Sequence, residues 1–567
     1  MKVQTLCLAA CAALMLSVNR ADACTNIIIS RGASADGSCM VSYAADSHML
    51  YGELYFQPAG KYKAGATRFV REWDTYKPLG FIHQARETYQ TVGNMNVHQL
   101  VIGETTWGGR ESQADPKGIM DYGSLIYVTL QRAKTARAAI DTVVALANRY
   151  GYPSEGETFS IADKDEAWVM DLVGKGPGNK GIVWVARRVP DGYICSHANQ
   201  CRITRFPLND PENCLYAPDV ISFAREMGWF SGADEDFSFR DAYNPLDFGG
   251  ARACDARAWS AFNMLGDGTF TYTENGKEVS RPASDWIEYA LGHDLKGEMP
   301  LFIKPSRKIT VKDVADAMRD HFEGTPLDMT QDIGAGGNAL PYRWRPMHFK
   351  WNGREYVNER AIATQQTGFW FVAQARGWLP DEVGALVWFG TDDAATSYLT
   401  PIYVSTKEVP GCLKVGNGDM LHYSPTSQFW ISNRIANACY KMYNQMAPYV
   451  RCAIDAFEQK QMFADVPEND AVLAELVKKG RVGKARKLMT KYSVNTAQKQ
   501  FAEWVKMEET LLIKFLDGNI KAQNEDGSFK YSDHSRGVPA KISNVPYTEA
   551  WRKAVAESEH GAILEVR

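Results

Sequence analysis

The chain has 567 residues, of which 45% are hydrophobic and 23% are charged, a composition typical of globular proteins. Its formal net charge of -4 is nearly neutral for this length, so there is no electrostatic reason to expect nucleic acid or an anionic membrane as a partner. The length exceeds that of one ordinary core, and we therefore expect a large main domain with an added one.

Residues 1–23 have the pattern of an export signal. Lys2 precedes an apolar run from Leu6 to Val18, and the small-x-small triplet Ala21-Asp22-Ala23 follows. The run is too short for a membrane span, and no later stretch reaches the roughly 18 apolar residues that a span requires. We predict cleavage before Cys24 and an exported protein, either periplasmic or secreted. A lipoprotein box ending in Cys11, with a lipid anchor there, is the alternative.

Residues 24–46 are expected to form a β-hairpin. The β-branched run "CTNIIIS" leads into turn residues that include Asp36-Gly37, and "CMVSYAAD" then resumes an apolar run. Antiparallel pairing about this turn would bring Cys24 within a couple of residues of Asp46. A carboxylate would then lie beside the amino terminus that signal cleavage creates.

The remaining pattern is that of an α+β protein. "SLIYVTLQRAKTARAAIDTVVALANRYG" predicts one amphipathic helix closed by Gly151, and "ETFSIADKDEAWVMDL" predicts two strands about an Asp/Lys turn. Residues 182–185 are apolar on both faces of a strand, which indicates layers on both sides of its sheet. From residue 426 the apolar residues have helical spacing, so we expect a mostly helical C-terminal region over 426–567.

Several segments, in this order along the chain, resemble those of the secernin and dipeptidase A family: "CTNIIISRGASADGS", "NMNVHQLVIGET", "AWVMDL", "VPDGYICSHANQCRI", "AYNPLDFGGARACDARAW" and "ERAIATQQTGFWFVAQARGWLPDEVGALVWFG". These proteins are cysteine N-terminal-nucleophile (Ntn) hydrolases, related more distantly to penicillin V acylase and bile salt hydrolase. The resemblance covers roughly residues 24–440. It implies a four-layer αββα sandwich, which we assign to residues 24–425, and hydrolysis of dipeptides or short peptides.

Cys24 is the candidate nucleophile. A thiol has an ordinary pKa of about 8.5 and an α-amino group one of about 7.7 to 8.0. An amino-terminal cysteine therefore supplies both the nucleophile and its general base, and a thioester intermediate would be released by water. This chemistry needs no metal or other cofactor, and no CxxC or His/Cys spacing in the sequence indicates a metal site.

The resemblance also implies roles for four further residues. Asn199 in "HANQ" would supply a side-chain amide to the oxyanion, and Asn96 in "NMNVHQL" a backbone N–H. Asp46 would bind the α-amine, and Arg360 in "NERAIATQQT" is a candidate active-site arginine. The chain departs from the acylase relatives at Tyr43, which occupies the position where they have an arginine.

Each of these residues also has a structural interpretation. Cys24 fits a structural cysteine or a lipid anchor, Asp46 a strand-end turn residue, and Arg360 an ion-pair partner. Asn96 and Asn199 are of a type that loops use freely. A conventional dyad of another cysteine with His48, His98 or His197 is a further alternative, although no CGSCW-like signature is present.

Three functional classes follow. The leading one is an exported dipeptidase acting on short peptides with a free amino terminus. The second is an amidase of N-acyl amines, and the third is a secreted binding protein that retains the fold without activity. The sequence leaves open whether the protein forms a homo-oligomer and whether cysteines such as Cys195, Cys201 and Cys214 pair.

Overall fold

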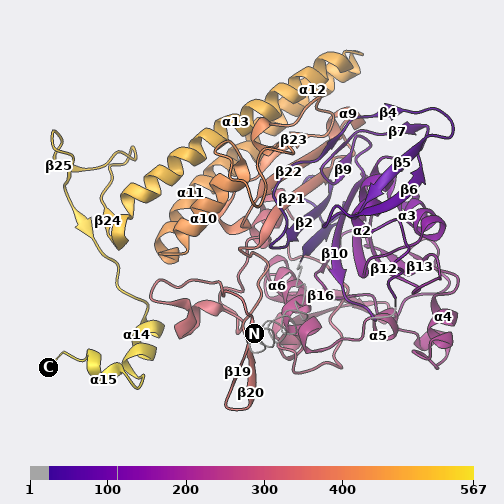
Figure 1. The fold of residues 1–567 in the computed structure, drawn as a ribbon, viewed down its shortest axis with the longest axis horizontal. Helices are drawn as coiled ribbons and strands as arrows, with labels where there is room; N and C mark the ends of the chain where they lie inside the picture. Colours follow the sequence, from indigo (N-terminus) through magenta and orange to yellow (C-terminus); the bar gives the residue numbers. More distant parts are fainter. Residues whose placement is uncertain (1–23, 111–112, 567) are drawn as a thin grey trace, which may run out of the picture.

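The computed structural model describes residues 24–110 and 113–566. The predicted signal peptide and the alternative anchor at Cys11 lie outside these residues. Two large antiparallel sheets form the centre of the molecule, and helices flank them (Figure 1). The α+β class predicted from the sequence is confirmed.

The first sheet has seven strands. In spatial order they are β18 (Phe302–Ile303), β14 (Ile194–His197), β1 (Thr25–Ile29), β2 (Cys39–Asp46), β21 (Thr367–Ala375), β22 (Ala385–Thr391) and β23 (Thr400–Tyr403). The two strands of the predicted hairpin, β1 and β2, therefore lie near the centre of this sheet.

The hairpin brings the candidate nucleophile and its candidate carboxylate together. Thr25 pairs with Ala44 across the ladder. Cys24, just before Thr25, and Asp46, just after Ala45, therefore lie at the same end of the two strands, as predicted. The pairing of β2 with β21 shifts register between Ala45 and Asp46. Because a bulge redirects the side chain of the strand that carries it, this irregularity sets the direction of Asp46.

The second sheet has eight strands. In spatial order they are β15 (Cys214–Tyr216), β13 (Ile182–Arg188), β12 (Ala167–Gly174), β11 (Gly156–Ala162), β10 (Val101–Trp107), β9 (Met95–Asn96), β8 (Thr91–Val92) and β3 (Phe56–Gln57). The predicted strand pair over 157–172 corresponds to β11 and β12. Residues 182–186 of β13 are all buried, in agreement with the two-faced apolar pattern.

The first sheet buries both of its faces. Ile28 and Val41 share a hydrophobic cluster with Phe159 of the second sheet. The neighbouring residues Ile27 and Met40 point the other way, as successive strand residues do, into a cluster with helices α6 (Ala256–Leu265) and α8 (Val311–Ala317). The hairpin that carries Cys24 and Asp46 is thus packed on both of its faces.

Helices α2 (Tyr122–Leu130) and α3 (Ala136–Tyr150) lie against the second sheet. The sequence predicted one helix here, and the structure corrects this to two. Asn96 Nδ2 donates to the carbonyls of Leu130 and Ala133, both at 2.8 Å, and so satisfies groups that a continuous helix would bond itself. Thr135 then caps α3, and Gly151 closes it at φ 80°, as predicted.

The C-terminal region begins with α10 (Gln428–Cys439), α11 (Tyr443–Lys460), α12 (Val466–Lys478) and α13 (Val482–Lys514). Met489 of α13 belongs to the hydrophobic cluster that joins the first sheet to α6 and α8. Trp504, further along α13, packs among α10 and α11. These helices lie along one side of the sheets, and the last strands and helices extend away from them (Figure 1). The boundary at residue 425 stays a prediction.

Shorter elements occupy the connections. They are α4 (Val220–Glu226), α5 (Phe239–Tyr243), α7 (Ile287–Ala290), α9 (Asp381–Gly384), α14 (Glu549–Ala556), α15 (Gly561–Leu564) and the ribbons β4–β7 (Gly60–Lys61, Glu87–Thr88), β5–β6 (Thr67–Arg71, Pro78–His83), β16–β17 (Thr269–Glu274, Lys277–Pro282), β19–β20 (His348–Trp351, Arg354–Val357), β24–β27 (Ile520–Lys521, Ile542–Ser543) and β25–β26 (Tyr531–Asp533, Val538–Pro539). In the part of the chain that the structure describes, no helix combines the length and apolarity needed to cross a membrane. The cysteines from Cys24 to Cys452 are free thiols, so the pairs considered for Cys195 are not formed.

Candidate active site

Cys24 lies immediately before β1 and is 5% exposed. Its Sγ is 3.5 Å from Glu104 Oε1 and 3.9 Å from the Tyr43 hydroxyl, which also donates to Glu104. Burial, followed by the negative charges of Glu104 and Asp46, raises the pKa of the Cys24 thiol well above its ordinary value. The thiol is therefore protonated at neutral pH in this form of the chain, and it needs a base to react.

Asp46 is buried and ion-paired. Its Oδ2 accepts a hydrogen bond of 2.5 Å from Arg360 Nη2, and its Oδ1 one of 2.6 Å from the Thr367 hydroxyl. Burial raises the pKa of Asp46, while Arg360 and Thr367 oppose that rise by stabilising the carboxylate. The structure thus brings two of the predicted site residues into direct contact.

Arg257 connects Cys24 to Asn199, and the sequence analysis did not single it out. Its Nη1 donates to the Cys24 carbonyl at 2.7 Å and to the Thr25 hydroxyl at 2.8 Å. Its Nη2 donates to Asn199 Oδ1 at 2.8 Å. Burial, together with the positive charge of Arg360, lowers the pKa of Arg257 to about 10. The guanidinium remains charged at neutral pH and holds three neighbours in place.

The local backbone explains how Arg257 reaches this position. It lies in the first turn of α6, directly after a π-helical segment, Gly250–Asp255. Wider helical turns of this kind are frequent at functional sites. The family-like segment "AYNPLDFGGARACDARAW" contains Arg257. It could have indicated a site residue here, but nothing in it distinguishes Arg257 from Arg252.

Asn199 follows β14 by two residues and is fixed at both ends of its amide. Its Oδ1 accepts from Arg257, and its Nδ2 donates to the Thr106 carbonyl at 2.6 Å. This pattern orients the amide unambiguously. The structure therefore links Asn199 to Cys24 through Arg257.

Asn96 has a different environment from the one predicted. Its backbone N–H, proposed for the oxyanion, donates to the Leu100 carbonyl at 2.9 Å. Its Oδ1 accepts from the His98 N–H at 2.9 Å, and its Nδ2 binds the end of α2 as described above. Among the described residues no hydrogen bond joins Asn96 to Cys24, Asp46 or Asn199. The geometry gives Asn96 a part in building the loop before β10.

Two buried carboxyls of the second sheet are neighbours, and one of them, Glu104, contacts the thiol. Glu104 of β10 is opposite Phe159 of β11, so Glu157, two residues earlier on β11, is its diagonal neighbour on the same face. They are 2% and 0% exposed. Burial raises the pKa of Glu104 to about 7, and burial together with the charge of Glu104 raises that of Glu157 well above its ordinary value. The two carboxyls titrate together, and burial favours the protonated form of each.

Close packing of the two sheets allows Cys24 to reach this pair. A Cβ added to Gly103 would lie 2.7 Å from the side-chain amide of Asn26, so only glycine permits β10 to approach β1 this closely. Glu104 is the residue after Gly103, so this close approach of the strands brings its carboxyl to the Cys24 thiol.

The alternative Cys-His dyad is not formed by His197. Its Nδ1 is 2.8 Å from the Thr105 hydroxyl and its Nε2 is 2.7 Å from the Ser160 hydroxyl. Burial lowers the pKa of His197 to about 3. This neutral histidine joins the two sheets and does not contact a thiol.

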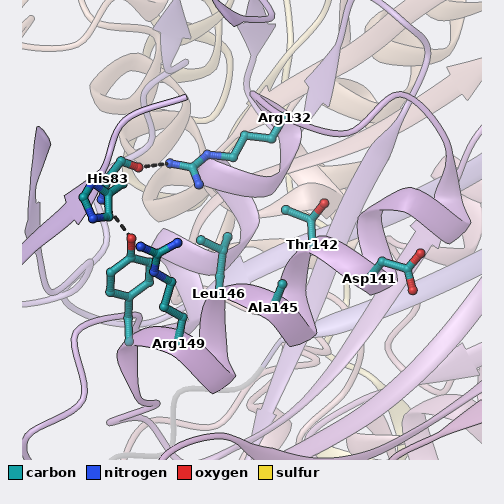
Figure 2. Close-up of a pocket in the computed structure, with 8 residues that line it drawn as sticks. His83, Arg132, Asp141, Thr142, Ala145, Leu146 and Arg149 are labelled. Carbon is teal, nitrogen blue, oxygen red and sulfur yellow. Dashed lines mark hydrogen bonds between the residues drawn. The ribbon is translucent and has the colours of Figure 1, made fainter. Parts of the chain in front are cut away.

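A cavity of about 400 Å³ lies elsewhere, against α3 (Figure 2). Arg132 there donates to the His83 carbonyl at 2.7 Å, and the His83 N–H donates to the Tyr150 hydroxyl at 2.9 Å. None of the described residues that line this cavity is a cysteine. A smaller hollow borders Arg360 and its neighbours Gln365 and Gln366, on the Asp46 side of the site.

Comparison with known proteins places the chain in a family. Residues 23–455 match the model of peptidase family C69. The chain belongs to peptidase family C69. The resemblance to the dipeptidase A family read from the sequence is confirmed, and the matched segment of this C69 peptidase begins one residue before Cys24.

Its curated relatives are named as dipeptidases. A probable dipeptidase of Salmonella dublin is 25% identical over 413 residues, which span 69% of this chain and 83% of the relative. A probable dipeptidase B of Lactococcus lactis subsp. lactis (strain IL1403) is 24% identical over 430 residues, 73% of this chain and 80% of the relative. Dipeptidase A of Lactobacillus helveticus is 21% identical over 463 residues, 77% and 85% of the two chains.

Proposed function

We propose that this C69 peptidase is an exported dipeptidase whose nucleophile is Cys24. The observation that carries the proposal is the position of Cys24, at the start of the family match and in contact with Arg257, which in turn binds Asn199. Asp46 and Arg360 lie at the facing strand end. The names of the relatives support dipeptides as substrates.

We also propose that the fold is the αββα sandwich of Ntn hydrolases. The packing of one face of the first sheet on the second sheet, and of the other on α6 and α8, supports this proposal. The contacts of α2 and α3 with the second sheet support it further.

In the proposed reaction, removal of residues 1–23 converts the Cys24 nitrogen from an amide into an amine. The amine takes the thiol proton, sulfur attacks the peptide carbonyl carbon, and the carbonyl electron pair moves onto oxygen. Asn199 donates an N–H to this oxyanion. The proton then passes from the amine to the leaving nitrogen as the C–N bond breaks, and a thioester remains.

Hydrolysis of the thioester completes the cycle. The amine, now neutral, removes a proton from water as its oxygen attacks the thioester carbonyl. The C–S bond breaks, the thiol is reprotonated, and a free amino acid leaves. Asp46 accepts a hydrogen bond from the amine in its ammonium form, and Arg360 stabilises the ionised form of Asp46. Arg257 fixes the Cys24 carbonyl, and with it the direction of the amine.

The test is the release of amino acids from dipeptides by the purified protein. We expect two free amino acids per turnover and no activity in Cys24→Ala. Hydrolysis of N-acyl amines, with dipeptides left intact, would contradict the dipeptidase proposal and favour an acylase. Activity that survives Cys24→Ala would contradict the nucleophile, and absence of any hydrolysis would favour a binding protein.

A further inference from the structure

The carboxyls of Glu104 and Glu157 have no cation as a partner. Within the described ranges, no lysine, arginine or histidine forms an ion pair with either residue. Their partners are hydroxyls, the Cys24 thiol and each other: Tyr43 donates to Glu104, and Thr106 donates to Glu157 Oε1 at 2.9 Å. Glu157 Oε2 is buried without any hydrogen-bond partner.

Such an arrangement is costly unless a ligand completes it. A buried carboxylate without a counter-charge loses the solvation of its charge. The proposed mechanism uses Cys24, Asp46, Asn199 and the arginines, and it gives these two carboxyls no part. A positive group that enters the site with the substrate would compensate them.

The position of Glu104 fits one such group. In a dipeptide the α-nitrogen of the first residue is about 2.5 Å from the carbonyl carbon that is attacked, and that carbon approaches the attacking sulfur to about 3 to 3.5 Å. Because Glu104 Oε1 is 3.5 Å from Sγ, the α-ammonium can lie within hydrogen-bond distance of Oε1 while the carbonyl faces the sulfur.

We propose that Glu104, supported by Glu157, binds the free α-ammonium group of the substrate's first residue and thereby selects dipeptides over N-acyl compounds. This inference rests on the proposed function and assigns its specificity to named residues. Tyr43 and Thr106 orient the two carboxyls, and an ammonium group supplies the positive charge that they lack.

The test compares a dipeptide with its analogue that lacks the amine. Ala-Ala and propionyl-Ala differ in the α-ammonium group, so the ratio of their kcat/KM values measures recognition of that group. The full chain is expressed and processed as wild type, Glu104→Gln, Glu157→Gln and Asp171→Asn. Asp171 is a matched control, since it is a buried carboxyl of the same sheet that bonds Thr158 and Cys201.

We expect the wild type to favour Ala-Ala by about 100-fold or more, because one charge-assisted hydrogen bond in a buried site accounts for a factor of this order. Glu104→Gln should reduce the ratio to within about 10-fold of unity, through loss of Ala-Ala turnover alone, and Glu157→Gln should reduce it less. Asp171→Asn should keep the wild-type ratio. Alkylation of Cys24 by iodoacetamide should persist in all four proteins.

Two results would overturn the inference. If Glu104→Gln lowers turnover of both compounds equally, Glu104 acts on the thiol or on the enzyme's own amine and does not recognise substrate. If both glutamate variants keep the wild-type ratio, neither carboxyl contacts the ammonium group. Failure of the wild type to hydrolyse Ala-Ala at all is a separate outcome that removes the dipeptidase proposal itself, and this inference with it.

Discussion

The carboxyls on the two sides of Cys24 are equally buried and differ in their counter-charge. Asp46 has Arg360 at 2.5 Å, whereas Glu104 and Glu157 have hydroxyls and one another. The first arrangement is complete within the protein and suits a part that must stay ionised through every turnover. The second is incomplete, and its missing charge is one that a peptide amino terminus supplies. Under our two proposals, the first arrangement serves the chemistry and the second serves substrate selection.

The largest effect is expected at the nucleophile between these two sides. Cys24→Ser should lower kcat/KM for dipeptides by about 10⁴-fold or more, as loss of a nucleophile does in other hydrolases. Cys452→Ser, at an exposed cysteine, is the matched control and should behave as wild type. Equal activity of the two variants in an amino-acid release assay would rule out Cys24.

Asn199→Ala tests the side of the site that binds the oxyanion. Loss of one oxyanion donor should lower kcat by about 10² to 10³-fold, with little change in KM, because the donor acts on charge that develops in the transition state. Steady-state kinetics measure this. Asn213→Ala, at an asparagine that bonds Asp210 in a loop, is the control. An unchanged kcat would remove Asn199 from the oxyanion site.

Arg360→Met removes the positive charge that pairs with the buried carboxylate of Asp46. Leaving Asp46 buried without its partner should reduce the free energy of unfolding by about 3 to 5 kcal/mol. Arg376→Met breaks another buried pair, with Asp470, and should cost a similar amount without lowering kcat of the folded fraction. Denaturant unfolding gives the energies. Arg360→Met would contradict the account if it left both stability and kcat unchanged.

Because Glu104 is buried without a cationic partner, its ionisation should make the free energy of unfolding depend on pH. The pKa of Glu104 is about 7 in the folded protein against an ordinary 4.5, so folding favours the protonated carboxyl, and stability present below pH 4.5 is lost as the pH rises through 7. Relative to Glu104→Gln, the wild type should lose about 1 to 3 kcal/mol between pH 5 and pH 8. Burial is the main cause of the raised pKa of Glu104 and the charge of Asp74 adds to it, while hydrogen bonds with Tyr43, Glu157 and Cys24 oppose the rise. Parallel stability profiles would show that Glu104 is compensated.

The sequence predicted the Asp46 side of the site, because local sequence pattern determines the hairpin that carries it. A turn at Asp36-Gly37 between two apolar runs determines that Cys24 and Asp46 meet, and this holds in the structure. Order along the chain was enough to identify the family. Arg360 and Asn199 were found through motifs, and the structure gives each a buried partner.

The Glu104 side of the site depends on the register between strands and on contacts between segments that are distant in the sequence. Glu104 and Glu157 stand in two similar Gly-Glu-Thr triplets, but only the pairing of β10 with β11 makes them neighbours. Arg257 reaches Cys24 through a helix from a different part of the chain. The split between α2 and α3 could not be read from periodicity, because it depends on Asn96 binding the carbonyls at the end of α2.

The central claim is that cleavage before Cys24 creates the base and exposes the nucleophile in one step. The most direct measurement is the mass of the amino-terminal peptide of the processed protein, with and without iodoacetamide. The account predicts a peptide that starts at Cys24, carries a free α-amine and gains one carbamidomethyl group on sulfur together with loss of activity. A mature chain that starts elsewhere, or a Cys24 whose amine is acylated, would contradict it, since neither has the base that the mechanism requires.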